Sequence, residues 1–431
     1  MILLCVSLSR RQVLSAAGVA GVAIASNRLL SASSASATVS LPPPATSGID
    51  HIVVVMMENR SFDHFLGWLP AANGEQAGLW FQDRYGAWHP TWHAQRFDTC
   101  GYNDPDHSFE GGRIELNGGA CDGWLRAGLN DAASISYYQQ ADLPFFGQAA
   151  PQWTVFDNYY AAVMAETYPN RFYQHCAQTP ELHNSTSTVT TPTIWDNLAA
   201  AGVSGKYYYG DIPFLALWGT KYLSIASPFA TFLADAAAGQ LPAVSFIDPR
   251  FEDESSGTSN DDHPHADIRS GETFLNQVYQ AVTTSPNWSR TALIINFDEW
   301  GGFFDHVVPP VATADVSQVT AQRGFRVPCM MISPFAPRGV VNHDLYDHTS
   351  ILKMIEWRWG LPALTPRDDA ANNLADALDF TSAPNLTAPS YSVPTFVTAG
   401  CDAGVTASVD GPESDEWSAL KVVAQQNGWT V

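Results

Sequence analysis

The sequence feature that most constrains this chain is a pair of short apolar runs, each of which stops abruptly on polar residues. Residues Ile52 to Met57 include three consecutive valines, and residues Thr291 to Phe297 are similarly apolar. Unbroken apolar runs of this length are typical of strands that are buried on both faces of a parallel sheet. Open α/β sheets bind ligands beyond the carboxyl ends of such strands. The polar residues that end the two runs are Glu58, Asn59, Asp298 and Glu299.

If the two strands are neighbours in one parallel sheet, their terminal polar residues converge on one point. Three carboxylates that meet without a counter-charge cannot all stay ionised. A divalent cation is the simplest partner for them, so the sequence predicts a metal site. Oxygen ligands without thiolate favour Ca²⁺, Mg²⁺ or Mn²⁺, and Zn²⁺ is an alternative. The expected ligands are Glu58, Asn59, Asp298 and Glu299.

Strand patterns alternate with helical patterns along most of the chain. The expected strands lie at 153–160, 205–209, 243–247 and 327–332, and the expected helices at 193–201, 229–238, 268–283 and 349–357. A further helix is expected to begin near Phe62, capped by Ser61 or Asp63. Helices of this length between buried strands predict an α/β fold with a mostly parallel sheet that is covered on both faces.

Two segments interrupt this alternation, and we interpret them as insertions on the sheet. Residues 79–96 are rich in Trp and Tyr and predict a hairpin with its turn at residues 83–86. Residues 103–128 are rich in glycine, which predicts an irregular loop that carries His107. We expect one catalytic domain at 48–383, followed by a tail, 384–431, that packs on it and contains a weak helix at 416–426.

The first 37 residues have the features of an export signal. SRRQVL at 9–14 is a twin-arginine pattern, an apolar run follows at 16–25, and ASA at 35–37 has the form of a cleavage site. A Sec signal or a membrane anchor is the alternative, although the apolar run is short for a span. We therefore predict export by the twin-arginine machinery to a secreted, periplasmic or envelope-associated location. Residues 38–47 are then a linker, and no transmembrane segment is expected in the mature chain.

The net charge of the chain argues against anionic partners, which would need a positively charged protein surface to bind them. The 431 residues include 43 acidic and 21 basic side chains, which gives a formal net charge of −22. Nucleic acids and anionic membrane surfaces are therefore not expected as partners.

The cysteines predict at most a small number of disulfides. Cys100 and Cys121 flank a Gly-rich segment and are candidates for one bond in an oxidising compartment. The three other cysteines outside the signal leave an odd count, so at least one free buried thiol is expected. No C-x-x-C pair occurs, which argues against a zinc finger or a thioredoxin-type site. The remaining cysteines are Cys176, Cys329 and Cys401.

Several histidines lie in polar, turn-rich stretches rather than on apolar faces, and an Asp precedes most of them. A neighbouring carboxylate favours imidazolium, which suits contact with a phosphate oxygen or protonation of a leaving group. Any one of them alone is more often a surface or structural residue, but together with the two strand ends they favour a catalytic site. These residues are His107, His263 with His265, His306 and His348.

Thr167, in the stretch ETYPNR, is the candidate nucleophile. Its hydroxyl would lose its proton readily beside a bound cation. Arg171 would then hold a phosphate through a bidentate fork. A helix N-cap is the alternative role for Thr167, and a buried ion pair is the alternative for Glu58.

These motifs together resemble the bacterial phosphoesterase family that contains phosphatidylcholine-type phospholipases C and acid phosphatase A. The resemblance runs in order from about residue 49 to 366. It is carried by residues 51–67 and by DPDHSFEGGR, ETYPNRFY, DDHPHADIRSGE, FDEWGGFFDHVVPP, SPFAPRG and DHTSILKMIEWRWG. It implies an alkaline-phosphatase-like three-layer α/β/α sandwich with loop or hairpin insertions. It also implies hydrolysis of phosphoric esters through a phosphorylated hydroxyl side chain.

Carried onto this sequence, the resemblance implies individual roles. One divalent metal would be bound by the four strand-end residues and by Thr167, which would also be the nucleophile. The phosphate would be held by Asn59, Arg171 and His107. The histidines that contact phosphate or protonate the leaving group would be His107, His306 and His348, with His263 close by.

The chain departs from the family in two respects. His265 stands where a second proline is common, so no direct role is assigned to it. The C-terminal β domains of many phospholipases C in the family are missing here, and these domains are a possible source of contact with membranes.

Three functions are compared. Phospholipase C-type cleavage of a phospholipid suits the Trp and Tyr residues of 79–92, which are fit for lipid or choline contacts. A broad acid phosphatase on soluble monoesters suits the compact length, and a metal-stabilised binding protein without catalysis is the third possibility. No G-x-S-x-G elbow or H-E-x-x-H motif occurs, so a serine hydrolase or zinc protease is not expected.

Overall fold

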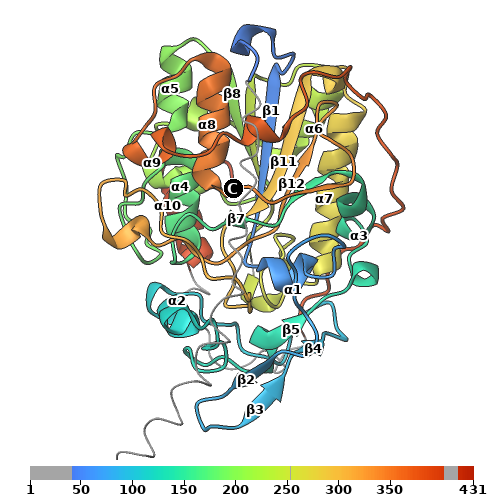
Figure 1. The fold of residues 1–431 in the computed structure, drawn as a ribbon. Helices are drawn as coiled ribbons and strands as arrows, with labels where there is room; N and C mark the ends of the chain where they lie inside the picture. The colour runs from blue at the N-terminus through green and yellow to red at the C-terminus, as the bar shows by residue number, and fades with distance from the viewer. Residues whose placement is uncertain (1–40, 253, 402–415) are drawn as a thin grey trace, which may run out of the picture. The chain divides into compact units, whose positions relative to one another are not determined.

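A mixed eight-stranded sheet forms the centre of the computed structural model, which describes residues 41–252, 254–401 and 416–431 (Figure 1). The strand order is β13-β6-β12-β11-β1-β10-β8-β9, and β12 alone of these strands runs antiparallel to its neighbours. The strands are β1 (His51–Met57), β6 (Thr154–Phe156), β8 (Gly205–Tyr209), β9 (Ala226–Pro228), β10 (Val244–Asp248), β11 (Thr291–Phe297), β12 (Cys329–Ile332) and β13 (Val340–Asn342).

Strands β1 and β11 are direct parallel neighbours, as the convergence of their ends requires. Their register pairs Met57 with Phe297, so the next residues of both strands leave the sheet side by side. Every residue of β11 is buried, which explains why its sequence has no polar alternation.

Helices cover both faces of this sheet, with α4, α5 and α8 on one side and α6 and α7 on the other (Figure 1). The predicted three-layer α/β/α sandwich is therefore confirmed. The helices are α1 (Phe62–Leu66), α2 (Phe109–Leu116), α3 (Phe146–Ala149), α4 (Thr167–Cys176), α5 (Ile194–Ala200), α6 (Phe229–Ala237), α7 (Ile268–Thr283), α8 (His348–Trp359), α9 (Pro366–Asp369) and α10 (Glu416–Gln426).

Side-chain caps account for several helix starts. The Ser61 hydroxyl accepts a hydrogen bond from the backbone N–H of His64 and begins α1. Thr193 and Asp196 form a reciprocal capping box at α5. Because such signals are local, the positions of these helices were predictable from sequence.

The two insertions have different outcomes. The hairpin is confirmed as β2 (Trp80–Gln82) and β3 (Trp88–Pro90). The expected irregular loop instead contains helix α2, capped by Ser108. Two of its glycines lie where the helix is closely packed, and a Cβ atom at Gly112 would lie 2.7 Å from Met164 Cγ. Two short pairings complete the insertions and loops: β4 (Trp92–His93) with β5 (Ser136–Tyr137), and β7 (Tyr159–Tyr160) with β14 (Tyr346–Asp347).

The disulfide joins Cys100 to Cys401, with the two Cα atoms 5.6 Å apart, so the expected bond to Cys121 is wrong. Cys121 packs in a separate apolar cluster with Trp124 and Phe325 and remains a buried thiol. The partner of Cys100 comes from the tail, which the spacing of cysteines along the chain did not indicate. Cys176 and Cys329 are also free and buried.

The expected export signal at 1–37 lies outside the described residues, as does the start of the linker. Within the described residues, no helix is long and apolar enough to cross a bilayer.

Candidate active site

The ends of β1 and β11 bring four predicted site residues together in the interior. Glu58, Asn59, Asp298 and Glu299 are all fully buried. Asn59 has a φ of +60°, in the left-handed region that asparagine tolerates better than most residues. Its backbone N–H donates a hydrogen bond to Asp298 Oδ1 at 3.1 Å, which links the two strand ends.

Thr167 is the first residue of α4, and its hydroxyl faces the same group. Thr167 Oγ1 donates to Asn59 Oδ1 at 3.4 Å, and Asn59 Nδ2 lies 3.1 Å from His107 Nε2. His107 Nδ1 lies 2.7 Å from the Pro105 carbonyl, which can only accept a hydrogen bond. The proton of a neutral His107 is therefore on Nδ1, and Nε2 accepts from the amide of Asn59. The helix start also places the Thr167 hydroxyl near the positive end of α4.

Arg171 lies one turn further along α4 and is surrounded by carboxylates. Its Nη2 is 2.8 Å from Glu58 Oε1, its Nη1 is 3.0 Å from Asp248 Oδ1, and its Nε is 3.5 Å from Asp298 Oδ2. Burial lowers the pKa of Arg171, but the charges of these three carboxylates outweigh burial and raise it. The guanidinium is therefore a permanent cation that holds the ends of β1, β10 and β11 together.

Sequence reasoning named His263 in the loop that faces Glu58 but missed Glu254. Glu58, Glu254 and His263 each offer one ligand atom, and these atoms lie within 4.8 Å of one another. The signal was available, because residues 252–262 are rich in acidic residues. Asp248 was also missed, although it ends β10 as Asp298 follows β11.

The protonation of His263 supports a cation at this point. His263 Nδ1 lies 2.9 Å from the Pro264 carbonyl and so carries the proton of the neutral ring. Burial lowers the pKa of His263 well below its usual range. The unprotonated Nε2 lies 3.8 Å from Glu254 Oε2, so two electron-pair donors face each other. A metal ion between the two atoms would accept from both.

Several carboxylate oxygens in this group are buried without a hydrogen-bond partner. They include Glu58 Oε2, Glu254 Oε1 and Asp261 Oδ2. Buried acceptors of this kind are costly unless a cation or proton neutralises them. Burial raises the pKa of Glu58 well above its usual range, against the opposing charge of Arg171. The excess of negative charge and the hard oxygen donors therefore fit a divalent metal ion.

Two of the predicted histidines lie outside this group. His348 is buried behind β11, where Nε2 donates to the Phe297 carbonyl at 3.0 Å and Nδ1 accepts from the Ala162 N–H at 3.4 Å. Burial lowers the pKa of His348 to about 4. His306 binds Asp63 and Asn73 in a second charged group. The structure thus brings together His107 and His263 but places His306 and His348 in other surroundings.

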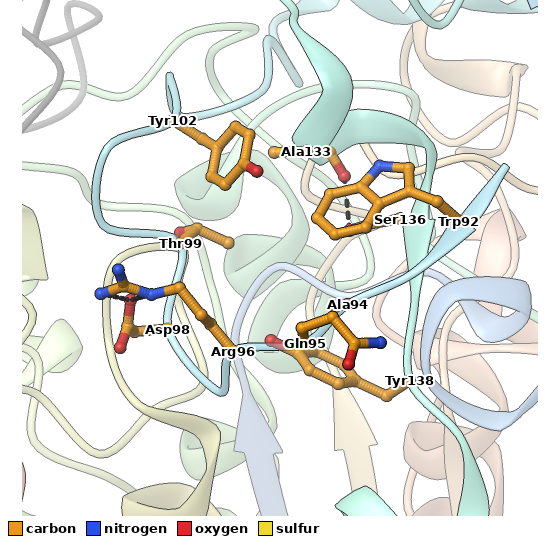
Figure 2. A pocket seen from close by; sticks show the side chains of 10 residues that line it. All are labelled: Trp92, Ala94, Gln95, Arg96, Asp98, Thr99, Tyr102, Ala133, Ser136 and Tyr138. Carbon is orange, nitrogen blue, oxygen red and sulfur yellow. Dashed lines mark hydrogen bonds and ion pairs between the residues drawn. The ribbon is translucent and has the colours of Figure 1, made fainter. Parts of the chain in front are cut away.

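A cavity of about 220 Å³ lies beside the segment that leads to His107 (Figure 2). Three aromatic rings line it, and those of Trp92 and Tyr102 are 5.9 Å apart. His265 connects this wall to the loop of His263, because its backbone N–H donates to Thr99 Oγ1 and its Nε2 lies 3.0 Å from the Tyr102 carbonyl. The lining residues are Trp92, Ala94, Gln95, Arg96, Asp98, Thr99, Tyr102, Ala133, Ser136 and Tyr138.

Comparison with known proteins identifies the family of this chain. The model of the Phosphoesterase family matches residues 49–362. The chain is 31% identical over 440 residues to Phospholipase C B of Mycobacterium tuberculosis, with 82% of each protein covered. It is 32% identical over 370 residues to Non-specific phospholipase C1 of Arabidopsis thaliana, covering 74% of this chain and 69% of the relative. A solved structure from Vibrio parahaemolyticus, described as a protein in the alkaline phosphatase superfamily, has a TM-score of 0.38 at 12% identity and covers 88% of both chains.

Proposed function

The chain belongs to the phosphoesterase family and is a phosphoric ester hydrolase; from this premise we propose that it is a metal-dependent phospholipase C that acts through a phospho-threonine intermediate. The observation that carries the proposal is the hydrogen bond from Thr167 to Asn59, which places a hydroxyl beside the buried carboxylates at the ends of β1 and β11. Thr167 begins helix α4, and its hydroxyl faces the charged and amide side chains of the site.

Each polar residue of the site has a role in the proposed reaction. Glu58, Asn59, Thr167, Asp298 and Glu299 would hold the metal ion, with Glu254 and His263 beside them. When bound, such an ion lowers the pKa of a neighbouring hydroxyl and offsets the charge of the phosphate.

The proposed reaction begins with in-line attack of Thr167 Oγ1 on phosphorus. The bond to the ester oxygen of the alcohol breaks as the bond to Thr167 forms. His107 Nε2 takes up the hydroxyl proton, the Asn59 amide holds an equatorial oxygen, and a solvent proton neutralises the departing oxygen on the opposite side of phosphorus. Water then hydrolyses the phospho-threonine.

The role of Arg171 in this proposal is to fix the carboxylates. Its three ion pairs hold Glu58, Asp248 and Asp298, and its direct contact with phosphate stays a prediction. The acid or phosphate-binding roles of His306 and His348 are likewise predictions. The hydrogen bonds of His348 instead suit a residue that steadies the end of β11.

We propose a phospholipid as the substrate because the relatives named above are phospholipases C. The aromatic cavity beside the site also supports this choice. The rings of Trp92, Tyr102 and Tyr138 suit a small cationic head group such as a quaternary ammonium, while the Asp98 carboxylate is already paired with Arg96.

Export is a further part of the proposal. The twin-arginine pattern at 9–14 supports transport across a membrane, and the disulfide between Cys100 and Cys401 suits an oxidising compartment.

The decisive experiment replaces the nucleophile. We expect Thr167→Val to lower turnover of phosphatidylcholine at least about 10⁴-fold, because the attacking oxygen is lost. Metal content, measured by elemental analysis, should be retained. Thr154→Val is the matched control, since Thr154 is a buried threonine of β6 whose hydroxyl bonds to the Pro337 carbonyl.

The other outcomes identify the alternatives. Unchanged turnover in Thr167→Val would remove Thr167 from the nucleophile role. Hydrolysis of a chromogenic phosphomonoester but not of phosphatidylcholine would indicate an acid phosphatase. Bound metal without hydrolysis of either would indicate a binding protein.

A further inference from the structure

The hairpin β2–β3 presents an aromatic face to solvent. Its register pairs Trp80 with Pro90 and Gln82 with Trp88, so these four side chains lie on one face. Trp80 and Trp88 are 56% and 60% exposed, and Tyr85 at the turn is 89% exposed. On the opposite face, Phe81 is only 7% exposed and packs against Phe304. Phe81 therefore joins one face of the hairpin to the core, while the other face, with Trp80 and Trp88, and the turn, with Tyr85, leave three large rings uncovered by the described residues.

The hairpin is held firmly in this position. The Asp83 carboxylate accepts hydrogen bonds from the N–H groups of Tyr85 and Ala87, which fixes the turn. The Arg84 guanidinium donates to the Gly128 carbonyl and ties the turn to the neighbouring loop. A hairpin whose backbone is already held in place loses little conformational entropy when it binds a partner.

The hairpin lies at the functional end of the sheet. Figure 1 shows β2 and β3 at the end where α1 follows β1, and the ends of β1 and β11 form the candidate active site. Two residues after Pro90, Trp92 lines the cavity beside the segment of His107. The exposed aromatic face and the proposed head-group cavity are thus connected by a few residues of chain.

The chemistry of this surface fits a neutral lipid interface. Trp and Tyr rings are favoured at the boundary between water and lipid because they combine an apolar body with a polar group. A net charge of −22 opposes attraction to anionic lipids. The charged residues of the turn are also engaged, Arg84 with a backbone carbonyl and Asp83 with its own turn.

We propose that the exposed face of this hairpin, formed by Trp80, Tyr85 and Trp88, anchors the enzyme to zwitterionic phospholipid surfaces. The inference rests on the proposed function, because a phospholipase must reach a substrate that is embedded in a bilayer.

Vesicle binding tests the anchor directly. The test variant carries both Trp80→Ser and Trp88→Ser, and its binding to phosphatidylcholine vesicles is measured by sedimentation. We expect its partition coefficient to be lower by about tenfold or more, since membrane affinity scales with buried apolar area. The measurements use a Thr167→Val background so that lipid is not consumed. Leu386→Ala is the matched control, because Leu386 is 55% exposed and its carbonyl bonds to Trp288, near the amino end of β11. Phenylalanine at both tryptophan positions should restore most of the binding.

Activity separates this inference from the proposed function. With Thr167 intact, the double serine variant should keep its hydrolysis of a soluble chromogenic phosphocholine ester and lose most hydrolysis of vesicles. Equal vesicle binding by the parent and double variant would overturn the anchor, as would a dimer in light scattering that the double variant disrupts. If the protein with Thr167 intact binds vesicles through Trp80 and Trp88 yet hydrolyses no phospholipid, that result would overturn the proposed function but not the anchor.

Discussion

Arg171 and Arg326 are both buried among carboxylates, yet the two groups around them are built differently. We call the first the Arg171 cluster (Glu58, Arg171, Asp248, Glu254, Asp261, His263 and Asp298) and the second the Arg326 cluster (Asp63, Asp305, His306 and Arg326). In the Arg326 cluster, Asp305 accepts hydrogen bonds on both oxygens from the guanidinium. Asp63 accepts on one oxygen from Arg326 and on the other from His306.

The Arg171 cluster contains more acid than its arginine can satisfy. Arg171 reaches Glu58, Asp248 and Asp298, but one oxygen each of Glu58 and Asp261 lacks a hydrogen-bond partner. Residue types alone do not separate the two clusters, since both include acid and histidine side chains with ligand atoms within 4.8 Å. The difference is that one network is complete, which suits a structural role, while the other is missing positive charge, which suits an ion-binding site.

The largest expected difference between the clusters is in catalysis. Asp298→Asn should lower kcat/KM roughly 10³-fold, because it removes a charge from the proposed metal site. Asp305→Asn should leave kcat/KM of the folded protein nearly unchanged. Steady-state kinetics on a soluble phosphodiester, with folded fractions determined by circular dichroism, checks both values. A comparable loss in Asp305→Asn would show that the Arg326 cluster takes part in the reaction.

Removing each arginine tests how the clusters are neutralised. Arg326→Met should lower the free energy of unfolding by about 3 to 5 kcal/mol, because Asp63 and Asp305 remain buried without their partner. Arg171→Met should also destabilise the protein, but excess divalent cation should restore part of the loss. Urea unfolding with and without the cation measures both responses. If the divalent cation restored the unfolding free energy of both variants equally, the proposed difference between the two clusters would be contradicted.

Metal removal distinguishes the clusters without disturbing either arginine. Chelation should lower the free energy of unfolding by about 3 kcal/mol if the ion is present at a hundred times its dissociation constant. Glu58→Gln should lose most of this response, whereas Asp63→Asn should retain it. Thermal unfolding with and without chelator gives the comparison, and a response that depends on Asp63 would assign the metal to the other cluster.

The smallest effect concerns pH. Burial lowers the pKa of His306, but the hydrogen bond and charge of Asp63 outweigh burial and raise it. Because the folded pKa is higher than the unfolded value of about 6.5, the pair stabilises the protein fully below that pH. This stability is lost as pH rises through the folded pKa, and the effect should be under about 1 kcal/mol since the ring is partly exposed. His306→Asn should flatten the decline between neutral and alkaline pH in chemical unfolding curves; an unchanged slope would contradict the pairing.

The central sheet and the meeting of the two strand ends were predictable because they follow from local patterns. A continuous apolar run identifies a doubly buried strand, and parallel strands end at the same edge. This placed Glu58 beside Asp298 without knowledge of the intervening chain. The start of α7 was equally predictable, since Asp267 caps it by accepting from the N–H of Arg269.

The partners of Arg171 and the position of Glu254 depend on how distant segments pack, so the acid-rich stretch at 252–262 did not by itself indicate that Glu254 would face Glu58. The glycines of α2 were misleading for a related reason, because Gly112 is required by close contact with Met164 rather than by a turn. His306 was predicted to contact phosphate or protonate the leaving group, and that role stays a prediction; its hydrogen bonds to Asp63 and Asn73 could be recognised only in three dimensions.

The bond between Cys100 and Cys401 makes one covalent ring of most of the described fold, since its sulfurs are 301 positions apart in the sequence. In the loop-entropy model, a ring of this size restricts the unfolded chain by about 5 to 6 kcal/mol. The disulfide links the segment that contains Thr99 and Tyr102 to a segment near the carboxyl end of the described residues. Such a bond forms and persists where the surroundings are oxidising. The segment that lines the aromatic cavity is therefore secured covalently only under oxidising conditions.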